Sequence, residues 1–344
     1  MAEIVFFCAL IVPEEDTMTT SNDTENTCLT RRLSHSLIVF FLVVFSPLTI
    51  HAYELLMGTG EKDSFSHFTG RTLCRLISLD SDLSCKAIPA PDSSHNLTNL
   101  RGGSLDIALI DSRILHDAFN KSGYFKFLDI TYDNLRTLVP LYTVPIVLVA
   151  RDDAKILSLD DLQGKRFNAG APLSPQHLAA DNIMVAKGWT KRNFNPLVEL
   201  PVNHAQGTLA FSGGTIQAML HIGVHPDPIL ARLLERAKAT LVDMDDPDIE
   251  KLVNTHSGFV KITIPAGTYS TNSEKVDTLG TEVSLVASED LDDTTVTAIL
   301  AAIFHNKEQL KKAHPTLSPT REASTNKLQG EVQPHRAVIK YFQK

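Results

Sequence analysis

The chain has 344 residues, of which 43% are hydrophobic and 21% charged, and its net charge is −8. This length predicts about two domains, and the composition is typical of a soluble globular protein, which excludes bulk disorder and collagen-like structure. Dedicated nucleic-acid-binding proteins normally carry an excess of basic residues, so the acidic balance argues against that class.

An apolar run near the N-terminus indicates export. Residues 37–45 (LIVFFLVVF) follow a pair of arginines, and a small residue, Ala52, lies a short distance beyond. This combination is typical of a secretory signal peptide, here with cleavage expected after Ala52. The run is shorter than the ~20 residues that span a bilayer, and an uncleaved anchor or a buried hairpin is the alternative. Because about thirty residues precede the run, the protein starts at either Met1 or Met18, and both remain open from the sequence.

In chain order, the predicted elements are a strand over 53–59, helices over 68–79 and 94–101, strands over 104–110 and 138–150, a single capped turn at 158–164, a strand over 165–169, a helix over 176–187, strands over 216–220, 240–243, 261–264 and 283–287, and an amphipathic helix over 293–312. Strands that alternate with helices predict the α/β class with largely parallel sheets.

Two of these strand-like segments, 144–149 and 283–287, stand where the chain would cross between two lobes. The predicted organisation is then a leader over 1–52, a first lobe over 53–143 plus 283–344, and a second lobe over 144–282. Two crossings would make a hinge.

Two cysteines follow the expected cleavage point, Cys74 and Cys85, eleven residues apart. In an oxidising compartment they form a natural disulfide pair, for which loop-closure entropy predicts roughly 3 kcal/mol of stabilisation. Two unrelated buried thiols are the alternative. With no CxxC and no histidine nearby in sequence, a metal site at these cysteines is not expected.

The sequence contains no HExxH, GxSxG, P-loop or GxGxxG in a strand–helix setting. His221, His225 and Asp227 have a spacing that could bind a metal on a helix, but a glycine and a proline interrupt the segment, which favours a loop. Residues 243–248 (DMDDPD) resemble a calcium loop without its glycine and closing glutamate, so a solvated turn is expected. We therefore expect no enzyme, no cofactor and no metal.

Two loops have the chemistry to hold an anion. Residues 58–60 (GTG) follow a strand, and residues 170–177 (GAPLSPQH) open a helix. Backbone N–H groups at a helix N-terminus, together with small hydroxyls, form a cradle for a carboxylate. Ordinary turns are the alternative when each loop is read alone.

From about residue 54 to residue 343, the chain resembles the TAXI family, the extracytoplasmic solute-receptor subunits of TRAP transporters, also called immunogenic proteins. The residues that carry the resemblance are Gly58-Thr59-Gly60, Thr69-Gly70, Cys74-Arg75-Leu76, Cys85, Asn96-Leu97, Arg101, Gly103, Leu105-Asp106, Asp160-Asp161-Leu162, Gly164-Lys165-Arg166, Asn168, Gly170, Pro172, Ser174, Gly188-Trp189-Thr190-Lys191, His225-Pro226, Ile264-Pro265, Gly267, Tyr269, Val276-Asp277-Thr278, His314-Pro315 and the 334–341 tail.

The resemblance implies a two-lobed fold similar to type II periplasmic binding proteins, with two crossing strands and a central cleft. It also implies a periplasmic and monomeric receptor that binds a small organic anion or amino acid, glutamate- or dicarboxylate-like, and delivers it to a TRAP-type membrane permease. The family's paired cysteines match Cys74 and Cys85 and support their disulfide.

The ligand loops depart from the family pattern, because three of the four have lost glycines. The candidate ligand-binding residues in these loops are Thr59, Gly60, Ser64, Asp92, Ser93, Ser112, Arg113, Ser174, Gln176 and His177. An acid such as Asp92 at a helix N-terminus would repel a carboxylate ligand. His177 would bind an anion well only below its ordinary pKa of ~6.5, whereas Arg113 adds positive charge at any pH.

The predicted function is therefore transport reception of a small solute. The alternative is a diverged ligand-sensing or docking module of the cell envelope that no longer serves transport. A permease gene beside this one would favour the first, and a sensor kinase or a lone gene would favour the second.

Overall fold

The computed structural model describes residues 53–201, 205–317, 319 and 332–343, all within the unit Ala52–Lys344. The predicted leader, signal peptide and cleavage site lie outside these residues. Within the described part, every helix is too short or too polar to cross a membrane.

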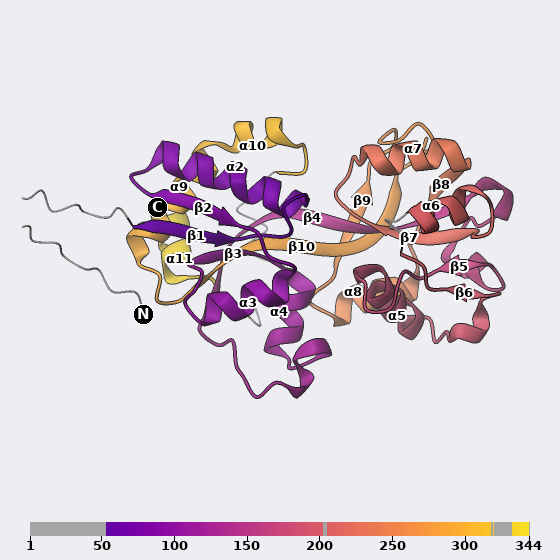
Figure 1. Ribbon diagram of the computed structural model, residues 1–344, viewed down its shortest axis with the longest axis horizontal. Helices are drawn as coiled ribbons and strands as arrows, with labels where there is room; N and C mark the ends of the chain where they lie inside the picture. The colour runs from indigo at the N-terminus through magenta and orange to yellow at the C-terminus, as the bar shows by residue number, and fades with distance from the viewer. Residues whose placement is uncertain (1–52, 202–204, 318, 320–331, 344) are drawn as a thin grey trace, which may run out of the picture. The chain divides into compact units, whose positions relative to one another are not determined.

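The first group of elements, here called the first lobe, builds on parallel strands near the start of the described chain. Its elements are β1 (Glu54–Gly58), α2 (Phe65–Asp80), β2 (Ser84–Ile88), α3 (Ser93–Arg101), β3 (Ile107–Asp111), α4 (Ser112–Phe119), the 3₁₀ helix η1 (Gly123–Phe127), and, from the C-terminal part of the chain, α9 (Asp293–His305), α10 (Lys307–Ala313) and α11 (Arg336–Gln343). Along β3, Ile107 and Leu109 join the core under α2 and α9, whereas Ala108 and Ile110 join the core under α3 and α4. Helices therefore cover both faces of these strands (Figure 1).

The second group, the second lobe, repeats this layering. Its elements are the 3₁₀ helices η2 (Asp152–Ala154), η3 (Leu159–Leu162) and η4 (Lys191–Asn193), the strands β5 (Phe167–Asn168), β6 (Leu197–Val198), β7 (Ala218–Ile222), β8 (Ala239–Val242) and β9 (Val260–Ile264), and the helices α5 (Pro175–Ala186), α6 (Ala205–Ser212), α7 (Pro228–Ala237) and α8 (Pro247–Thr255). One core cluster includes residues of α5 and α8, and a second cluster includes residues of α6 and α7.

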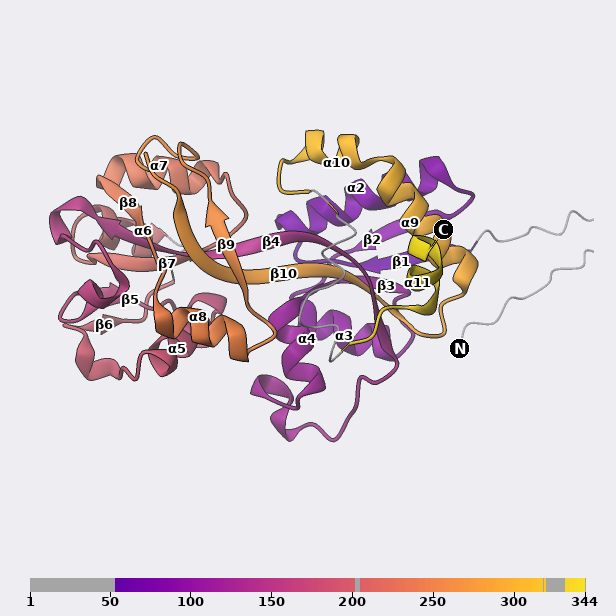
Figure 2. The same ribbon diagram turned by 180° about the vertical axis from the view of Figure 1, so that it is seen from behind.

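Two long strands, β4 (Leu135–Arg151) and β10 (Val276–Ser288), run through both lobes (Figures 1 and 2). They pair with each other from Leu135 to Ile146 of β4. Beyond that point β4 pairs with β7 on one side and β8 on the other, while β10 pairs with β9 at its start and β3 at its end. The ten strands of the described residues form one sheet, with the main order β2-β1-β3-β10-β4-β7-β5-β6.

The expected α/β class and the two crossing strands are confirmed, and three details are corrected. The sheet is mixed rather than largely parallel, because every pairing of β4 or β10 with another strand is antiparallel. The helix expected over 293–312 is two helices, broken at Asn306, whose side-chain amide donates to the carbonyl of Ala302 at 2.8 Å. The strand expected over 216–220 is displaced to Ala218–Ile222. The limits of the lobes at 143/144 and 282/283 stay a prediction.

The disulfide between Cys74 and Cys85 is present and ties α2 to β2. We expect the double substitution Cys74→Ala with Cys85→Ala to lower the free energy of unfolding by roughly 3 kcal/mol, because the unfolded chain regains the entropy of an open loop. Urea unfolding measures this loss. A reducing agent should destabilise the wild type to a similar degree and leave the double variant unchanged. A wild type indifferent to reduction would contradict the prediction.

Candidate functional site

The directions of the strands make the two lobes face each other with the carboxyl ends of their strands. β3 is antiparallel to β10, and β10 is antiparallel to β4, so β3 runs with β4 from the first lobe toward the second, as do β1 and β2. β7 is antiparallel to β4 and parallel to β5, which is parallel to β6, so these strands run back toward the first lobe. Ligands of open α/β sheets bind beyond the carboxyl ends of the strands, and here those ends point toward one another.

On the first-lobe edge, the loop after β1 is held by its own hydrogen bonds. Thr59 is fully buried, and its Oγ1 lies 2.8 Å from Nδ1 of His67 and 3.0 Å from the carbonyl oxygen of Ile88. The backbone N–H of Gly60 donates to Oγ of Ser66 at 3.1 Å. The polar groups of Thr59 and Gly60 therefore shape this loop.

Three candidate residues cap helices at these edges. Ser64 accepts from the backbone N–H of His67 at 3.1 Å, Asp92 from that of His95 at 2.8 Å, and Ser174 from that of His177 at 3.2 Å. Each side chain satisfies an N–H group that the helix leaves without an intrahelical partner. An anion that approached these helix starts would compete with the cap, and at Asp92 it would meet a negative charge.

Asp111, at the end of β3, organises two further candidates. Its backbone N–H donates to Oγ of Ser93 at 3.2 Å, and its carboxylate accepts from Thr281 Oγ1 at 2.5 Å and from the backbone N–H of Arg113 at 3.0 Å. The guanidinium of Arg113 lies 3.3 Å from the carboxylate of Asp117. Because of this ion pair, Arg113 contributes little net positive charge to the edge.

Ser112 connects the two lobes. Its hydroxyl, 1% exposed, donates to the carbonyl oxygen of Gly258 at 2.7 Å and accepts from the backbone N–H of Glu282 at 2.9 Å. A Cβ on Gly258 would lie only 2.7 Å from Cα of Arg113, so the backbones are in close contact here. The structure therefore places the Ser112 hydroxyl in protein hydrogen bonds between α4, β10 and the segment that follows α8.

On the second-lobe edge, His177 lies among acids. Its Nε2 is 3.6 Å from Oδ2 of Asp181 and 4.0 Å from Oε1 of Glu199, and its Nδ1 is 3.3 Å from the carbonyl oxygen of Gly170. Gly170 has φ +92°, and a Cβ there would lie 2.7 Å from Cβ of Gln176, so both conformation and space require glycine. Gln176 is 8% exposed at the start of α5. The structure thus brings Ser174, Gln176 and His177 together.

A polar network in the loop after β7 joins His225 and Asp227 to Tyr269, a contact that the sequence does not predict. The hydroxyl of Tyr269 accepts from the backbone N–H of Asp227 at 2.9 Å and lies 2.5 Å from Nδ1 of His225. Nε2, the other ring nitrogen of His225, is buried without a hydrogen-bond partner in the part of the chain that the structure describes. Burial raises the pKa of Tyr269 to about 12.

The expectation of a loop at 221–227 is confirmed only in part. His221 lies in β7, whereas His225 lies in the loop, and Nε2 of His221 is 3.1 Å from Oδ2 of Asp227. A different group among the described residues has the spacing of metal ligands: His116, Asp117 and His256 offer ligand atoms within 4.8 Å of one another. The carboxylate of Asp117 also accepts from Ser122 and lies beside the Arg113 guanidinium, and these contacts compete with a cation.

Acidification should destabilise the protein through His225. Burial and the neighbouring His221 lower its pKa to about 4. Because an unfolded histidine titrates near ~6.5, the unfolded state binds a proton that the folded state rejects, so this contribution is complete above pH ~6.5 and is lost toward pH ~4. We expect the free energy of unfolding to fall by on the order of 2 kcal/mol, because partial exposure of the ring reduces the full effect of the pKa shift. Urea unfolding at pH 7 and 4.5 measures it.

Two variants isolate this contribution. His225→Asn keeps a hydrogen-bonding group near the Nδ1 position and should flatten the pH dependence, whereas His95→Asn, at an exposed position of α3, should leave it unchanged. An equal pH dependence in all three proteins would show that His225 is not the responsible group.

Two α/β lobes joined by two crossing strands, with the carboxyl ends of their strands facing each other, define the two-lobed fold of periplasmic binding proteins. The chain belongs to the NMT1-like family, whose family model matches residues 57–344.

Two solved structures are similar to this chain. A TctC solute binding protein from Polaromonas is 14% identical, covers 79% of this chain and 91% of its own, and has a TM-score of 0.54. PhnD1 from Prochlorococcus marinus MIT 9301, in complex with methylphosphonate, is 12% identical, covers 84% of this chain and 97% of its own, and has a TM-score of 0.49. The likeness to the TctC protein shows the fold.

Proposed function

We propose that this protein is an extracytoplasmic solute-binding receptor that holds a small organic anion or amino acid between its two lobes. The observation that carries the proposal is the direction of the strands, which makes the loops after β1, β2 and β3 face the loops after β5, β6 and β7. The NMT1-like family match and the fold shared with a solute binding protein support it. The protein acts as a binder rather than an enzyme.

The charges at the facing edges favour an amino acid over a dianion. Asp92 lies at one edge and Asp181 lies beside His177 at the other, whereas the nearby Glu199 already accepts from Nζ of Lys191 at 2.6 Å. A ligand that carries both a carboxylate and an ammonium group would use these acids, whereas a dicarboxylate would meet them as like charges. His177 and Gln176 are the proposed partners of the ligand carboxylate.

The resemblance to TAXI receptors extends the proposal to the partner and the compartment. The receptor is exported by the segment before Tyr53, works in the periplasm as a monomer, and passes its ligand to a TRAP-type permease. Its lobes divide at 143/144 and 282/283, and closure about the two crossing strands buries the ligand.

Titration calorimetry of the full-length protein with glutamate, other amino acids and succinate at pH 5.5 and 7.5 tests the proposal. Gln176→Ala should weaken the binding of the preferred amino acid at least tenfold. Gln309→Ala, at an exposed position of α10, is the matched control and should bind like the wild type. Folded wild type that binds none of these solutes, or equal affinities of both variants, would reject the site.

A second function, a ligand-sensing or docking module without transport, is favoured by one observation. Asp92 places a negative charge at the start of α3 on the first-lobe edge, and this charge disfavours an anion there. Such a module would bind a ligand or an envelope protein and would not support uptake by a co-expressed TRAP permease. Uptake that depends on Gln176 would exclude it.

A further inference from the structure

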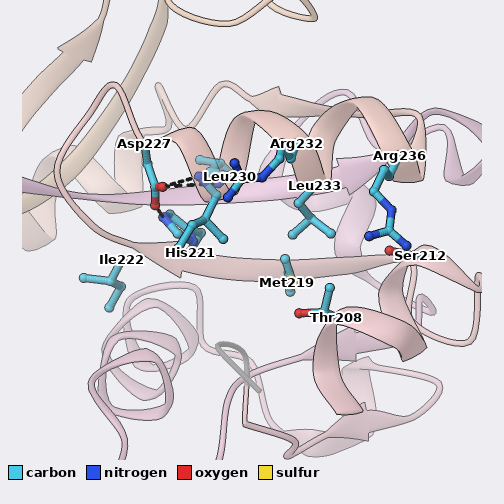
Figure 3. Close-up of a pocket in the computed structure, with 11 residues that line it drawn as sticks. Thr208, Ser212, Met219, His221, Ile222, Asp227, Leu230, Arg232, Leu233 and Arg236 are labelled. Carbon is cyan, nitrogen blue, oxygen red and sulfur yellow. Dashed lines mark hydrogen bonds and ion pairs between the residues drawn. The ribbon is translucent and has the colours of Figure 1, made fainter. Parts of the chain in front are cut away.

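We infer that the second lobe holds a separate binding site for an amphipathic organic anion, a molecule with an apolar body and a carboxylate- or phosphate-type end. The site is a cavity of about 380 Å³ between α6 and α7, above β7 (Figure 3). This volume lies in the range of small-molecule pockets, about 300–1,000 Å³. The inference does not depend on the ligand proposed for the space between the lobes.

The body of the cavity is apolar. Met219 of β7 and Leu230 and Leu233 of α7 line it and belong to the core cluster that includes α6 and α7. Ile222 and Ile229 complete the apolar lining, and Ile229 is 68% exposed. An alkyl or aryl group placed here would be removed from water against these side chains, which is favourable at roughly 25 cal/mol per Å² of apolar surface.

The cavity carries positive charge without a counter-ion among the described residues, with Arg236 at the end beside Ser212 and Arg232 between the two ends (Figure 3). Arg232 and Arg236 line it from one face of α7, four residues apart, and neither makes an ion pair or a hydrogen bond to any residue that the structure describes. Ser212 of α6 lines the cavity with them, and its buried hydroxyl has no hydrogen-bond partner among the described residues. Guanidinium groups bind carboxylates and phosphates through two parallel hydrogen bonds, and a hydroxyl supplies a third donor.

The end of the cavity away from Arg236 is polar, but its charged group is already satisfied by contacts within the protein. Figure 3 shows His221 and Asp227 there, with Arg236 and Ser212 at the far end. The carboxylate of Asp227 accepts from the backbone N–H groups of Ile229 and Leu230 and lies 3.1 Å from His221. These contacts satisfy Asp227 within the protein, so the cavity is suited to a molecule with one anionic end.

The site also lies on a different surface from the one between the lobes. α6 and α7 pack against residues of β4 and β7 such as Val147 and Met219, whereas α5, which carries Gln176 and His177, packs against residues such as Leu148 and Leu220. Neighbouring residues of a strand point to opposite faces of a sheet. A ligand can therefore occupy this cavity without touching Gln176 or His177.

Titration calorimetry of the full-length protein with octanoate tests the inference, with octylamine as the probe of opposite charge. We expect octanoate to bind and octylamine not to bind. Substituting both cavity arginines (Arg232→Gln with Arg236→Gln) should weaken octanoate binding at least tenfold. The matched control is Arg71→Gln with Arg75→Gln, which removes two exposed arginines of the same spacing from α2 in the first lobe.

The inference is supported if octanoate binding is lost in the cavity variant and kept in the α2 variant. It is overturned if the wild type does not bind octanoate, if octylamine binds as well as octanoate, or if the two double variants bind octanoate equally.

Discussion

Replacing Gly280 with alanine should lower the free energy of unfolding by about 4 kcal/mol or more. Gly280 lies in β10 opposite Pro145 of β4, where the two crossing strands pair. An added Cβ would lie 2.5 Å from the carbonyl oxygen of Val144 and 2.9 Å from Cα of Pro145. Both are backbone atoms of the partner strand, so the clash can be relieved only by separating the strands that join the lobes.

Urea unfolding of the full-length protein measures this effect. Gly102→Ala is the control, because Gly102 has a helical φ of −80° at the end of α3 and its Cβ would approach no atom closer than 3.3 Å. We expect Gly102→Ala to change stability by no more than about 1 kcal/mol. If Gly280→Ala proved as stable as the control, the close pairing of β4 and β10 at this position would be wrong.

Replacing Ser112 with alanine should cost about 3 to 4 kcal/mol of stability, because it removes the partner of two buried backbone groups at once. The carbonyl of Gly258 and the N–H of Glu282 both bind its hydroxyl, and the side chain is shielded from water. One of these groups belongs to the segment after α8 and the other to a crossing strand. The loss should therefore also loosen the contact between the lobes.

Ser270→Ala is the control for this experiment, because Ser270 is exposed and its single hydrogen bond, to Glu235, lies at the surface. It should change stability by no more than about 0.5 kcal/mol. A Ser112→Ala protein with unchanged stability but weaker ligand binding would restore the ligand-contact role that the loop resemblance implies for Ser112. A large loss of stability would assign the hydroxyl to the architecture.

The fold could be predicted from the sequence where the pattern of apolar residues is strong. The strand expected over 53–59 and the helix expected over 68–79 match β1 and α2 closely, since their apolar residues repeat at the strand and helix periods. The pattern of apolar residues does not predict whether a strand runs parallel or antiparallel to its neighbours. An apolar run such as 138–150 looks the same whether its neighbours run with it or against it, which is why the antiparallel pairing of β4 was missed.

Two of the helices that are absent from the sequence prediction, α7 and α8, begin at residues that resemble other kinds of site. Asp227 was considered as a metal ligand and residues 243–248 as a turn, yet Asp227 and Asp246 each cap a helix whose first residue is proline. An aspartate followed by proline is a good helix start, because proline has no N–H group to leave unsatisfied. Read as caps, these two pairs would have predicted α7 and α8.

The candidate site was predictable in its parts but not in its contacts. The positions of Ser64, Asp92 and Ser174 at loop–helix junctions follow from the sequence, but the same hydroxyl or carboxylate can face a ligand or cap the helix. The pairing of His225 with Tyr269 joins residues 44 positions apart, and that of Ser112 with Gly258 joins residues 146 apart. Only the tertiary fold brings such groups together.

The position of β10 in the sheet has a consequence for the order in which the chain can fold. β10 is among the last strands in the sequence, yet it lies between β3 and β4, and the main core of the first lobe also requires α9 and α11. The early strands therefore cannot complete their sheet until nearly the whole chain has been made. For a receptor exported as proposed above, this order means that the N-terminal half has no finished core to unfold while the chain is threaded through the membrane.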